Sequence, residues 1–190
     1  MIPPDLPSPA DAGPAIRELG SAERRAAVEV INTAADWYRE FLPPEELHSP
    51  EMDESGWDAE AERMTWWGAF SDRRLVGVTG SEPIGDVLLI RHLYVLPEHQ
   101  RSGVAGALIR HIEEISPDSV GMIVAGTYTA NYKARGVLEK SGYRPAADSE
   151  RVLRAYYDIP EDRLLGSIAY VKRVDPPGRR SERRRRGVTG

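Results

Sequence analysis

The chain has 190 residues, 41% apolar, 29% charged and 7% aromatic, which is an ordinary globular composition at a length that favours one domain. It contains no cysteine, which excludes disulfides, cysteine zinc sites and thiolate nucleophiles, and its four histidines show no metal-ligand spacing, so no metal site is expected. No apolar run approaches the ~20 residues needed to span a bilayer, and the N-terminus does not resemble a signal peptide. We therefore expect a cytoplasmic protein without membrane contact.

The two ends of the chain differ in composition from its middle. Residues 1–14 contain five prolines and almost nothing that can bury, so they predict a flexible arm. Residues 175–190 hold six arginines against Asp175 and Glu182, and the rest of the chain is left with a net charge of −9. Because an acidic body repels nucleic acid, we expect nucleic-acid binding, if any, only through this arginine-rich tail, which is predicted to be disordered. The folded domain is predicted to span residues 15–174.

The first elements alternate between strand and helix. A short strand is predicted over 15–19. Ser21 is a good N-cap, and apolar residues at helical spacing predict a helix that begins there and ends at Pro43-Pro44. The acidic segment that follows predicts one helix near 55–64.

From residue 64 the pattern becomes that of strands. Segments 64–70 and 75–80 predict two strands joined by a tight hairpin. Segment 86–95 is nearly all apolar, which suits a strand covered on both faces. A helix over 102–115 and a buried strand over 120–128 follow.

The last third predicts a short helix over 131–141, ended by Gly142, and then strands over 151–157 and 168–174. This order of elements predicts an α/β domain around a mixed sheet.

Gly103, Ala105 and Gly106 fall where the loop after the strand at 86–95 opens into the next helix. Unpaired backbone N–H groups at a helix start, together with the helix dipole, bind phosphate, and small residues let the anion approach closely. Small residues alone could equally serve the packing of a strand against a helix, so these glycines do not decide between the two roles.

Two longer strings resemble the signatures of the GCN5-related N-acetyltransferase (GNAT) superfamily. Gln100-x-x-Gly103-x-Ala105 matches the Q/R-x-x-G-x-G/A signature, and residues 131–143 resemble the N-x-x-A-x-x-F-Y-E-K-x-G-F segment. The resemblance implies an α/β fold with a mixed, mainly antiparallel sheet of about six to seven strands flanked by helices. It also implies a V-shaped splay between the fourth and fifth strands.

The resemblance further implies acetyl-CoA as co-substrate, lying in that splay. Its pyrophosphate would rest on backbone N–H groups of the turn, and its pantetheine arm would pair with the fourth strand. The residues implied in coenzyme binding are Tyr94, Val95, Arg101, Ser102, Gly103, Val104, Ala105, Gly106 and Asn131.

The activity implied is acetyl transfer to a primary amine, expected to be that of a small molecule, by direct attack in a ternary complex. The tyrosine that commonly serves as acid falls on Leu138, which cannot donate a proton. Candidate replacements are Tyr94, Tyr128 and Tyr132, with Tyr128 as the first choice. The alternative is a catalytically degenerate module that binds acyl-CoA in a regulatory or structural role.

Arg91 interrupts the apolar strand and, by alternation, shares a face with Leu89. It could bind a substrate carboxylate or pair with an acidic residue on a neighbouring strand, and both readings stay open. His92 is predicted to point the other way, as a satisfied core histidine.

The acceptor pocket is expected to draw on the first helix and on the acidic segment after it, where Trp37, Tyr38, Glu45, Glu46, Glu51 and Trp57 are available. The abundant carboxylates suggest a cationic amine, and the more ordinary alternative is that they form a solvated acidic loop. The chain is expected to be a monomer or a homodimer.

Overall fold

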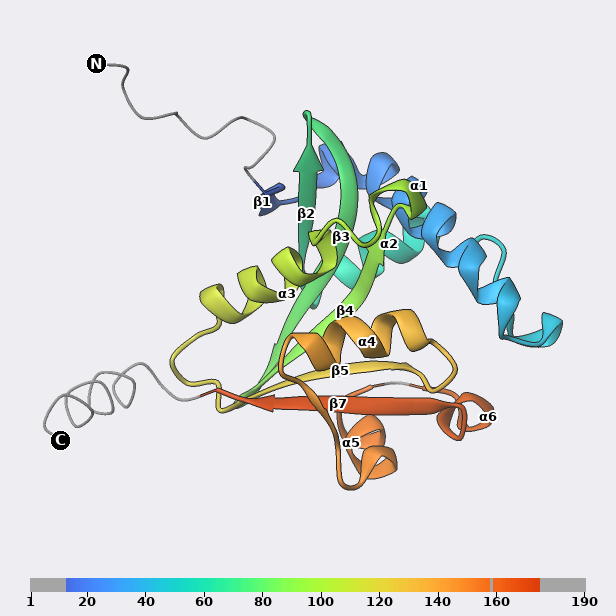
Figure 1. Cartoon of the computed structure of the whole chain (residues 1–190), viewed down its shortest axis with the longest axis vertical. Coiled ribbons are helices and arrows are strands. Elements are labelled where there is room, and N and C mark those ends of the chain that lie inside the picture. The colour runs from blue at the N-terminus through green and yellow to red at the C-terminus, as the bar shows by residue number, and fades with distance from the viewer. Residues whose placement is uncertain (1–12, 158, 175–190) are drawn as a thin grey trace, which may run out of the picture.

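The structure is a computed structural model that describes residues 13–157 and 159–174, so the arm and the tail, apart from Gly13 and Pro14, lie outside the described residues. Its centre is a seven-stranded sheet in the order β1-β2-β3-β4-β5-β7-β6 (Figure 1). The strands are β1 (Ala15–Glu18), β2 (Thr65–Ser71), β3 (Arg74–Ile84), β4 (Val87–Val95), β5 (Met122–Tyr128), β6 (Arg144–Pro145) and β7 (Ser167–Arg173). The α-helices are α1 (Arg24–Ala35), α2 (Glu54–Ala61), α3 (Val104–Ile115), α4 (Tyr132–Lys140), α5 (Ser149–Tyr156) and α6 (Glu161–Leu164). None of the described helices is both long enough and apolar enough to cross a bilayer.

The sheet is antiparallel except where β4 meets β5. These two strands pair in parallel from Val87 opposite Met122 to Ile90 opposite Ala125. Beyond that pair β4 continues to Val95 and β5 to Tyr128, and the two strands diverge (Figure 1). The mixed, mainly antiparallel sheet with a V-shaped splay is therefore confirmed.

Helices cover both faces of the sheet because β4 carries apolar side chains on both. Leu88 and Ile90 pack in a cluster with residues of α3, β5 and α4, and Leu89 packs on the opposite face with residues of α5. In Figure 1 α3 and α4 lie in front of the strands. This two-sided burial is the one that the apolar run predicts.

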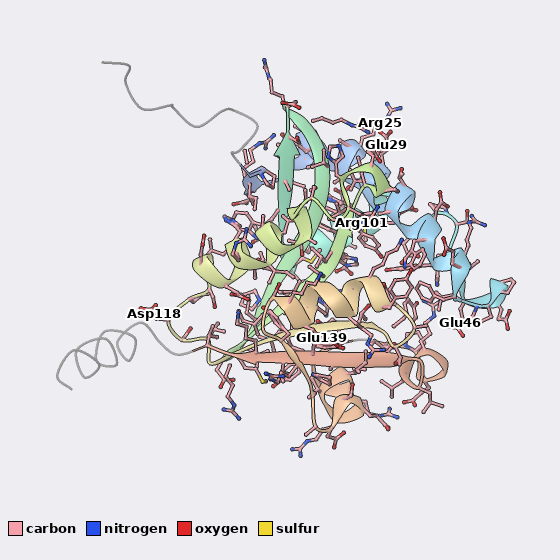
Figure 2. The ribbon with its side chains drawn as sticks, viewed as in Figure 1. Arg25, Glu29, Glu46, Arg101, Asp118 and Glu139 are labelled. Carbon is pink, nitrogen blue, oxygen red and sulfur yellow. The ribbon has the colours of Figure 1, made fainter. Side chains whose placement is uncertain are left out.

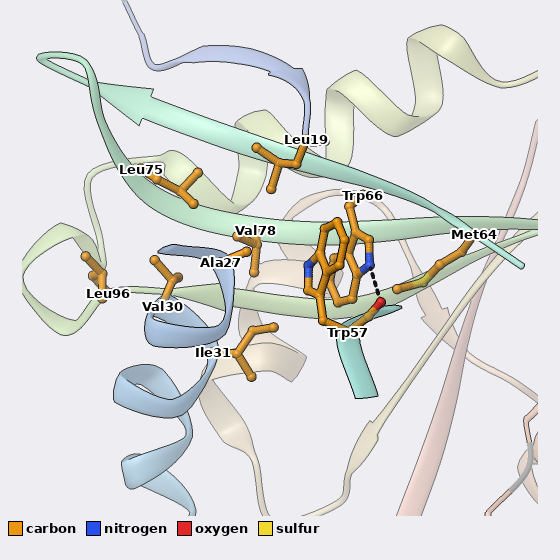
Figure 3. Close-up of a cluster of buried hydrophobic side chains, with 10 residues drawn as sticks. All are labelled: Leu19, Ala27, Val30, Ile31, Trp57, Met64, Trp66, Leu75, Val78 and Leu96. Carbon is orange, nitrogen blue, oxygen red and sulfur yellow. Dashed lines mark hydrogen bonds between the residues drawn. The ribbon is translucent and has the colours of Figure 1, made fainter. Parts of the chain in front are cut away.

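The largest cluster on the second face holds α1 and α2 against β2 and β3 (Figure 3). Trp57 of α2 stacks on Trp66 of β2 with ring centroids 5.6 Å apart, and the Trp66 indole N–H donates to the Trp57 carbonyl at 3.4 Å. Ala27 and Ile31 of α1 belong to the same cluster as these two tryptophans and are fully buried. The packing fixes the acidic segment between α1 and β2, which borders the site described below.

The prediction of a strand over 151–157 is wrong, because residues 149–156 form the helix α5. Asp148 accepts a hydrogen bond from the Arg151 amide at 3.0 Å and so caps the helix, and Val152, Leu153 and Tyr156 follow at helical spacing. The sixth strand in chain order is instead β6, a two-residue segment that pairs with β7.

The predicted first helix is divided into shorter pieces. A 3₁₀ turn over Ser21–Glu23 precedes α1, and a second 3₁₀ segment over Asp36–Glu40 follows it. The N-cap is Gly20 rather than Ser21, and the Glu23 carboxylate accepts from the Gly20 amide at 3.0 Å. The second 3₁₀ segment carries Trp37 and Tyr38.

Candidate active site

A cavity of about 290 Å³ lies where β4 and β5 part, close to the lower end of the range for ligand pockets. Its walls come from both strands of the splay and from segments on either side of it. The cavity is lined by residues 90–94 and 125–128 of the two strands, by Asn131, Ala134 and Leu138 at α4, and by Tyr38, Glu51, Tyr157, Ile159, Pro160, Arg163 and Ser167.

A β-bulge distorts β4 at this cavity. Gly80 of β3 lies opposite Arg91, and Val78 lies opposite Tyr94, so β4 uses one residue more than β3 over the same stretch. His92 has a φ of +52°, in the left-handed region. A bulge places two successive side chains on the same face of a strand. The expectation that His92 points away from Arg91 is therefore wrong.

His92 is nevertheless satisfied by partners on that face. Its Nε2 lies 3.2 Å from Glu60 Oε2, and its ring lies 5.2 Å from the Trp66 ring. Burial raises the pKa of Glu60, but hydrogen bonds from His92 and Arg63 outweigh it and lower that pKa to about 2. The histidine is thus held by a carboxylate at the cavity wall.

The turn before α3 is built to expose its backbone amides. Arg101 and Gly103 have φ values of +63° and +88°, and a Cβ added at Gly103 would find no heavy atom of the described residues within 4 Å. No side chain in the described ranges caps the first turn of α3. Figure 2 shows Arg101 beside that turn. Free amides facing open space at a helix start fit the pyrophosphate of a coenzyme.

The turn is tied to β4 by a residue of the first motif. Gln100 Nε2 donates to the Val95 carbonyl at 3.1 Å, and Ser102 Oγ donates to the His99 carbonyl at 2.6 Å. Val104, the first residue of α3, buries its side chain against the face of the sheet that this helix covers. These contacts fix the turn beside the end of β4 at which the splay is widest.

Asn131 and Leu138 both line the cavity from α4. Asn131 is 6% exposed, and its Oδ1 accepts from the Ala134 amide at 3.1 Å, so it caps α4. Leu138 is 2% exposed and occupies the position at which the resemblance implies a tyrosine. The cavity therefore has an apolar wall where a proton donor is usual.

Three of the tyrosines singled out in the sequence come together at the cavity. Tyr38 Oη donates to Tyr94 Oη at 3.2 Å, and Tyr94 Oη donates to Glu51 Oε1 at 3.2 Å. The rings of Tyr38 and Tyr128 lie 5.5 Å apart, edge to face. Burial raises the pKa of Tyr94 well above its usual value and also raises that of Tyr128. Both phenols are consequently protonated at neutral pH.

Trp37 does not line the cavity. Its ring packs edge to face against Tyr132, with centroids 5.3 Å apart, and Lys133 Nζ lies 3.3 Å from its ring centroid. Tyr132 is 64% exposed on the outer side of this contact. The tryptophan thus joins the segment after α1 to the start of α4.

Glu51 is the site residue that the sequence pattern did not distinguish from its acidic neighbours. The Asn32 side chain of α1 exchanges two hydrogen bonds with the Met52 backbone, at 2.8 and 3.1 Å, and so holds the segment beside the cavity. Burial raises the pKa of Glu51, an effect that the Tyr94 hydroxyl partly opposes. Asn32 lies 20 residues from Met52, and Tyr94 lies 43 residues from Glu51, so no short-range pattern in the sequence predicts these contacts.

Arg91 faces the same side as Leu89, as expected, and its partner is an acidic residue of the neighbouring strand. Its Nε pairs with Glu82 of β3, and both side chains are 10% exposed. Nη2 donates to the Tyr156 carbonyl at 3.1 Å, and the guanidinium lies 4.7 Å from the Tyr157 ring centroid. The structural alternative for Arg91 is therefore the one observed, and a role in binding a substrate carboxylate stays a prediction.

Comparison with known proteins gives a family and a fold. The model of the acetyltransferase (GNAT) family matches residues 31–143. Human N-acetyltransferase 8 is 29% identical over 91 residues, so the match spans 44% of this chain and 40% of that relative's length. The PaiA N-acetyltransferase from Thermoplasma acidophilum, solved in complex with coenzyme A, superposes with a TM-score of 0.67 at 16% identity, over 84% of this chain and 98% of that one. The ribosomal-protein-S18-alanine N-acetyltransferase from Escherichia coli superposes with a TM-score of 0.61 at 18% identity, over 85% and 94%.

Proposed function

The chain belongs to the acetyltransferase (GNAT) family, and from this premise we propose that it transfers the acetyl group of acetyl-CoA to a primary amine of a small molecule within a ternary complex. The observation that carries the proposal is the cavity at the parting of β4 and β5, lined by the end of the strand that leads into the open turn at Gly103. A coenzyme bound along the turn and the splay would place its acyl end in that cavity.

The coenzyme supplies an activated acetyl group, and the protein supplies its binding and orientation. The amides of residues 101–106 would hold the pyrophosphate, as predicted from the motif. Pairing of β4 with β5 ends at Ile90, so the β4 backbone groups beyond it that face the splay would be available to the pantetheine arm and, where they are amides, to a developing oxyanion.

Proton transfer is assigned to Glu51 and Tyr128. As the amine nitrogen bonds to the acetyl carbon and the carbon–sulfur bond breaks, the Glu51 carboxylate takes the amine proton and Tyr128 protonates the departing thiolate. Tyr94 is less suited to act as the acid, because its hydroxyl proton is committed to Glu51. We assign Tyr94 instead to orienting that carboxylate, with Tyr38 behind it.

One observation favours the alternative, a module that binds acyl-CoA without turning it over. Leu138 presents an apolar wall where the resemblance implies the catalytic tyrosine. Because coenzyme contacts depend largely on backbone amides, they would survive the loss of catalysis.

An assay that follows thiol release from acetyl-CoA with a panel of primary amines separates the two functions. We expect at least one amine to give release above hydrolysis, together with saturable acetyl-CoA binding by calorimetry. Tight binding with no release for any amine would establish the module instead, and absence of binding would refute both.

A further inference from the structure

The hydroxyl of Tyr157 lies at the point where β4 and β5 separate. It donates to the Ile90 carbonyl of β4 at 3.1 Å and accepts from the Gly126 amide of β5 at 3.1 Å. The Val124 carbonyl is 3.3 Å away. Ile90 and Ala125 form the last opposed pair of the ladder, so the hydroxyl lies at the last rung before the strands part.

Regular parallel pairing would connect Ile90 and Gly126 directly. When Ile90 lies opposite Ala125, its carbonyl is oriented toward the amide of the residue that follows Ala125, which is Gly126. In this structure the Tyr157 oxygen bonds to both groups, 3.1 Å from each. Two hydrogen bonds that meet on one oxygen at an ordinary angle hold their outer atoms roughly 5 Å apart, whereas a short direct bond brings them to about 3 Å. The hydroxyl therefore competes with close direct pairing at this last rung.

The Tyr157 ring is held firmly enough to keep the hydroxyl there. Arg91 stacks on the ring and is itself fixed by Glu82 and by the Tyr156 carbonyl. On the strand side the ring lies against Gly126, where an added Cβ would come within 3.4 Å of it. Burial raises the pKa of the Tyr157 hydroxyl, so it stays protonated and able to donate to Ile90.

We propose that Tyr157 is a positioning residue that separates β4 from β5 at the vertex of the splay and thereby keeps the coenzyme site open. The inference rests on the proposed function, because the space that the tyrosine maintains is the space assigned to acetyl-CoA. It also explains the buried Arg91–Glu82 pair, which holds the ring from the other side.

The test replaces only the hydroxyl, with Tyr157→Phe. Without it we expect β4 and β5 to pair more tightly at their last rung, so that NMR detects scalar coupling across a hydrogen bond between Gly126 N and the Ile90 carbonyl carbon that is absent or weaker in the wild type. Coenzyme binding must then work against this tighter pairing, so the Kd for acetyl-CoA should rise about fivefold to tenfold. The kcat at saturation should change by less than about twofold, because the groups assigned to proton transfer are untouched.

Tyr156→Phe is the matched control, since it removes the neighbouring hydroxyl, which has no hydrogen-bond partner among the described residues. It should leave both readouts unchanged. If Tyr157→Phe does not fold, Gly126→Val is the second variant: a Cβ there would already lie 3.4 Å from the ring, so the added methyl groups should displace it and weaken acetyl-CoA binding, whereas Gly121→Val, with open space around its Cβ, should not.

Unchanged coupling and an unchanged Kd in Tyr157→Phe would overturn the proposal. The coupling is measured without ligand, so it is independent of the proposed function. A wild-type protein that fails to bind acetyl-CoA would refute that function while the appearance of the coupling in the variant would still support the separating role.

Discussion

Individual side chains of this site take their chemistry from partners far along the chain. Glu51 receives the Tyr94 hydroxyl, and Arg91 pairs with Glu82 across the sheet. Arg91 is largely buried and Glu51 is partly buried, and an ionised side chain away from water is costly unless it is paired or hydrogen-bonded. Burial of Glu51 therefore shapes the pH dependence of activity, and burial of the Arg91–Glu82 pair sets how much stability is lost when Arg91 is replaced.

Glu51→Gln should lower kcat/KM by roughly a hundredfold, the lower range for loss of a general base. Glu51 accepts a proton only when ionised, and burial raises its pKa above the usual 4.5, so wild-type activity should fall off as the pH drops through that raised value. The bend in the acidic limb should be absent from the variant. Glu62→Gln, at an exposed position, is the control. An identical pH profile in Glu51→Gln would remove the carboxylate from the mechanism.

Arg91→Ala should destabilise the fold by about 3 kcal/mol, because it leaves the Glu82 carboxylate buried with only the longer Arg63 contact. The measurement is the free energy of unfolding in urea, compared with the double variant Arg91→Met/Glu82→Leu, which should recover most of the loss. A loss below about 1 kcal/mol combined with a raised KM for a carboxylate-bearing acceptor would favour the substrate-binding reading.

At the scale of elements, the turn from β4 into α3 has a backbone that suits the anion site predicted there, whereas the segment after β6 differs from its prediction. Gly103 combines a left-handed φ with open space, which explains why a small residue stands at that position. The prediction of a strand over 151–157 is wrong. The Asp148 cap and the docking of Leu153 on β7 decided for the helix α5.

Gly103→Asp should abolish acetyl-CoA binding, because it places a carboxylate where the pyrophosphate is expected. Gly103→Asn has nearly the same shape and tolerates a left-handed φ, so it should retain most of the affinity. Calorimetric titration of the two variants separates charge from backbone strain, and their melting temperatures should agree closely. Equal affinities would mean that the pyrophosphate lies elsewhere.

The whole molecule consists of two halves joined along the short parallel ladder. The first comprises β1 to β4 with α1, α2 and α3, and the second β5 to β7 with α4, α5 and α6. Beyond the ladder, contacts between Tyr38 and Tyr128 and between Trp37 and Tyr132 connect the halves across the cavity. Arg163 of α6 adds a bond to the Glu46 carbonyl at 3.2 Å, and Figure 2 shows Glu46 on the segment that follows α1.

A ligand in the splay should stabilise both halves together. We expect saturating acetyl-CoA to raise the melting temperature and to slow hydrogen exchange at residues 91–95 and 126–128, which lie beyond the ladder. Residues 87–90 are already paired with β5 and should change little. Mass spectrometry of exchange with and without ligand checks this. Protection confined to the ladder or to β1 and β2 would contradict the placement.

Much of the fold and part of the site followed from local pattern. Hydrophobic periodicity predicted β4, β5 and α3 closely, since burial of a strand or helix face leaves a regular trace in the sequence. The motif around Gly103 predicted an anion site because backbone conformation there depends on the glycine itself. The bulge at His92 was not predicted, because short-range spacing does not determine it. The helix α5 does have a local signal, the Asp148 cap and the helical spacing of its apolar residues, which the prediction of a strand missed.

The sequence by itself thus determined the family resemblance, the α/β order and the small residues of the turn before α3, all of which depend on neighbours within a few positions. Only the tertiary structure decided which carboxylate reaches the cavity, which partner Arg91 takes and what holds β4 and β5 apart. Glu51 with Tyr94, Arg91 with Glu82, and Tyr157 with Ile90 are brought together by packing of distant segments. The physical reason is that a buried polar group requires a partner but does not specify where along the chain that partner must lie.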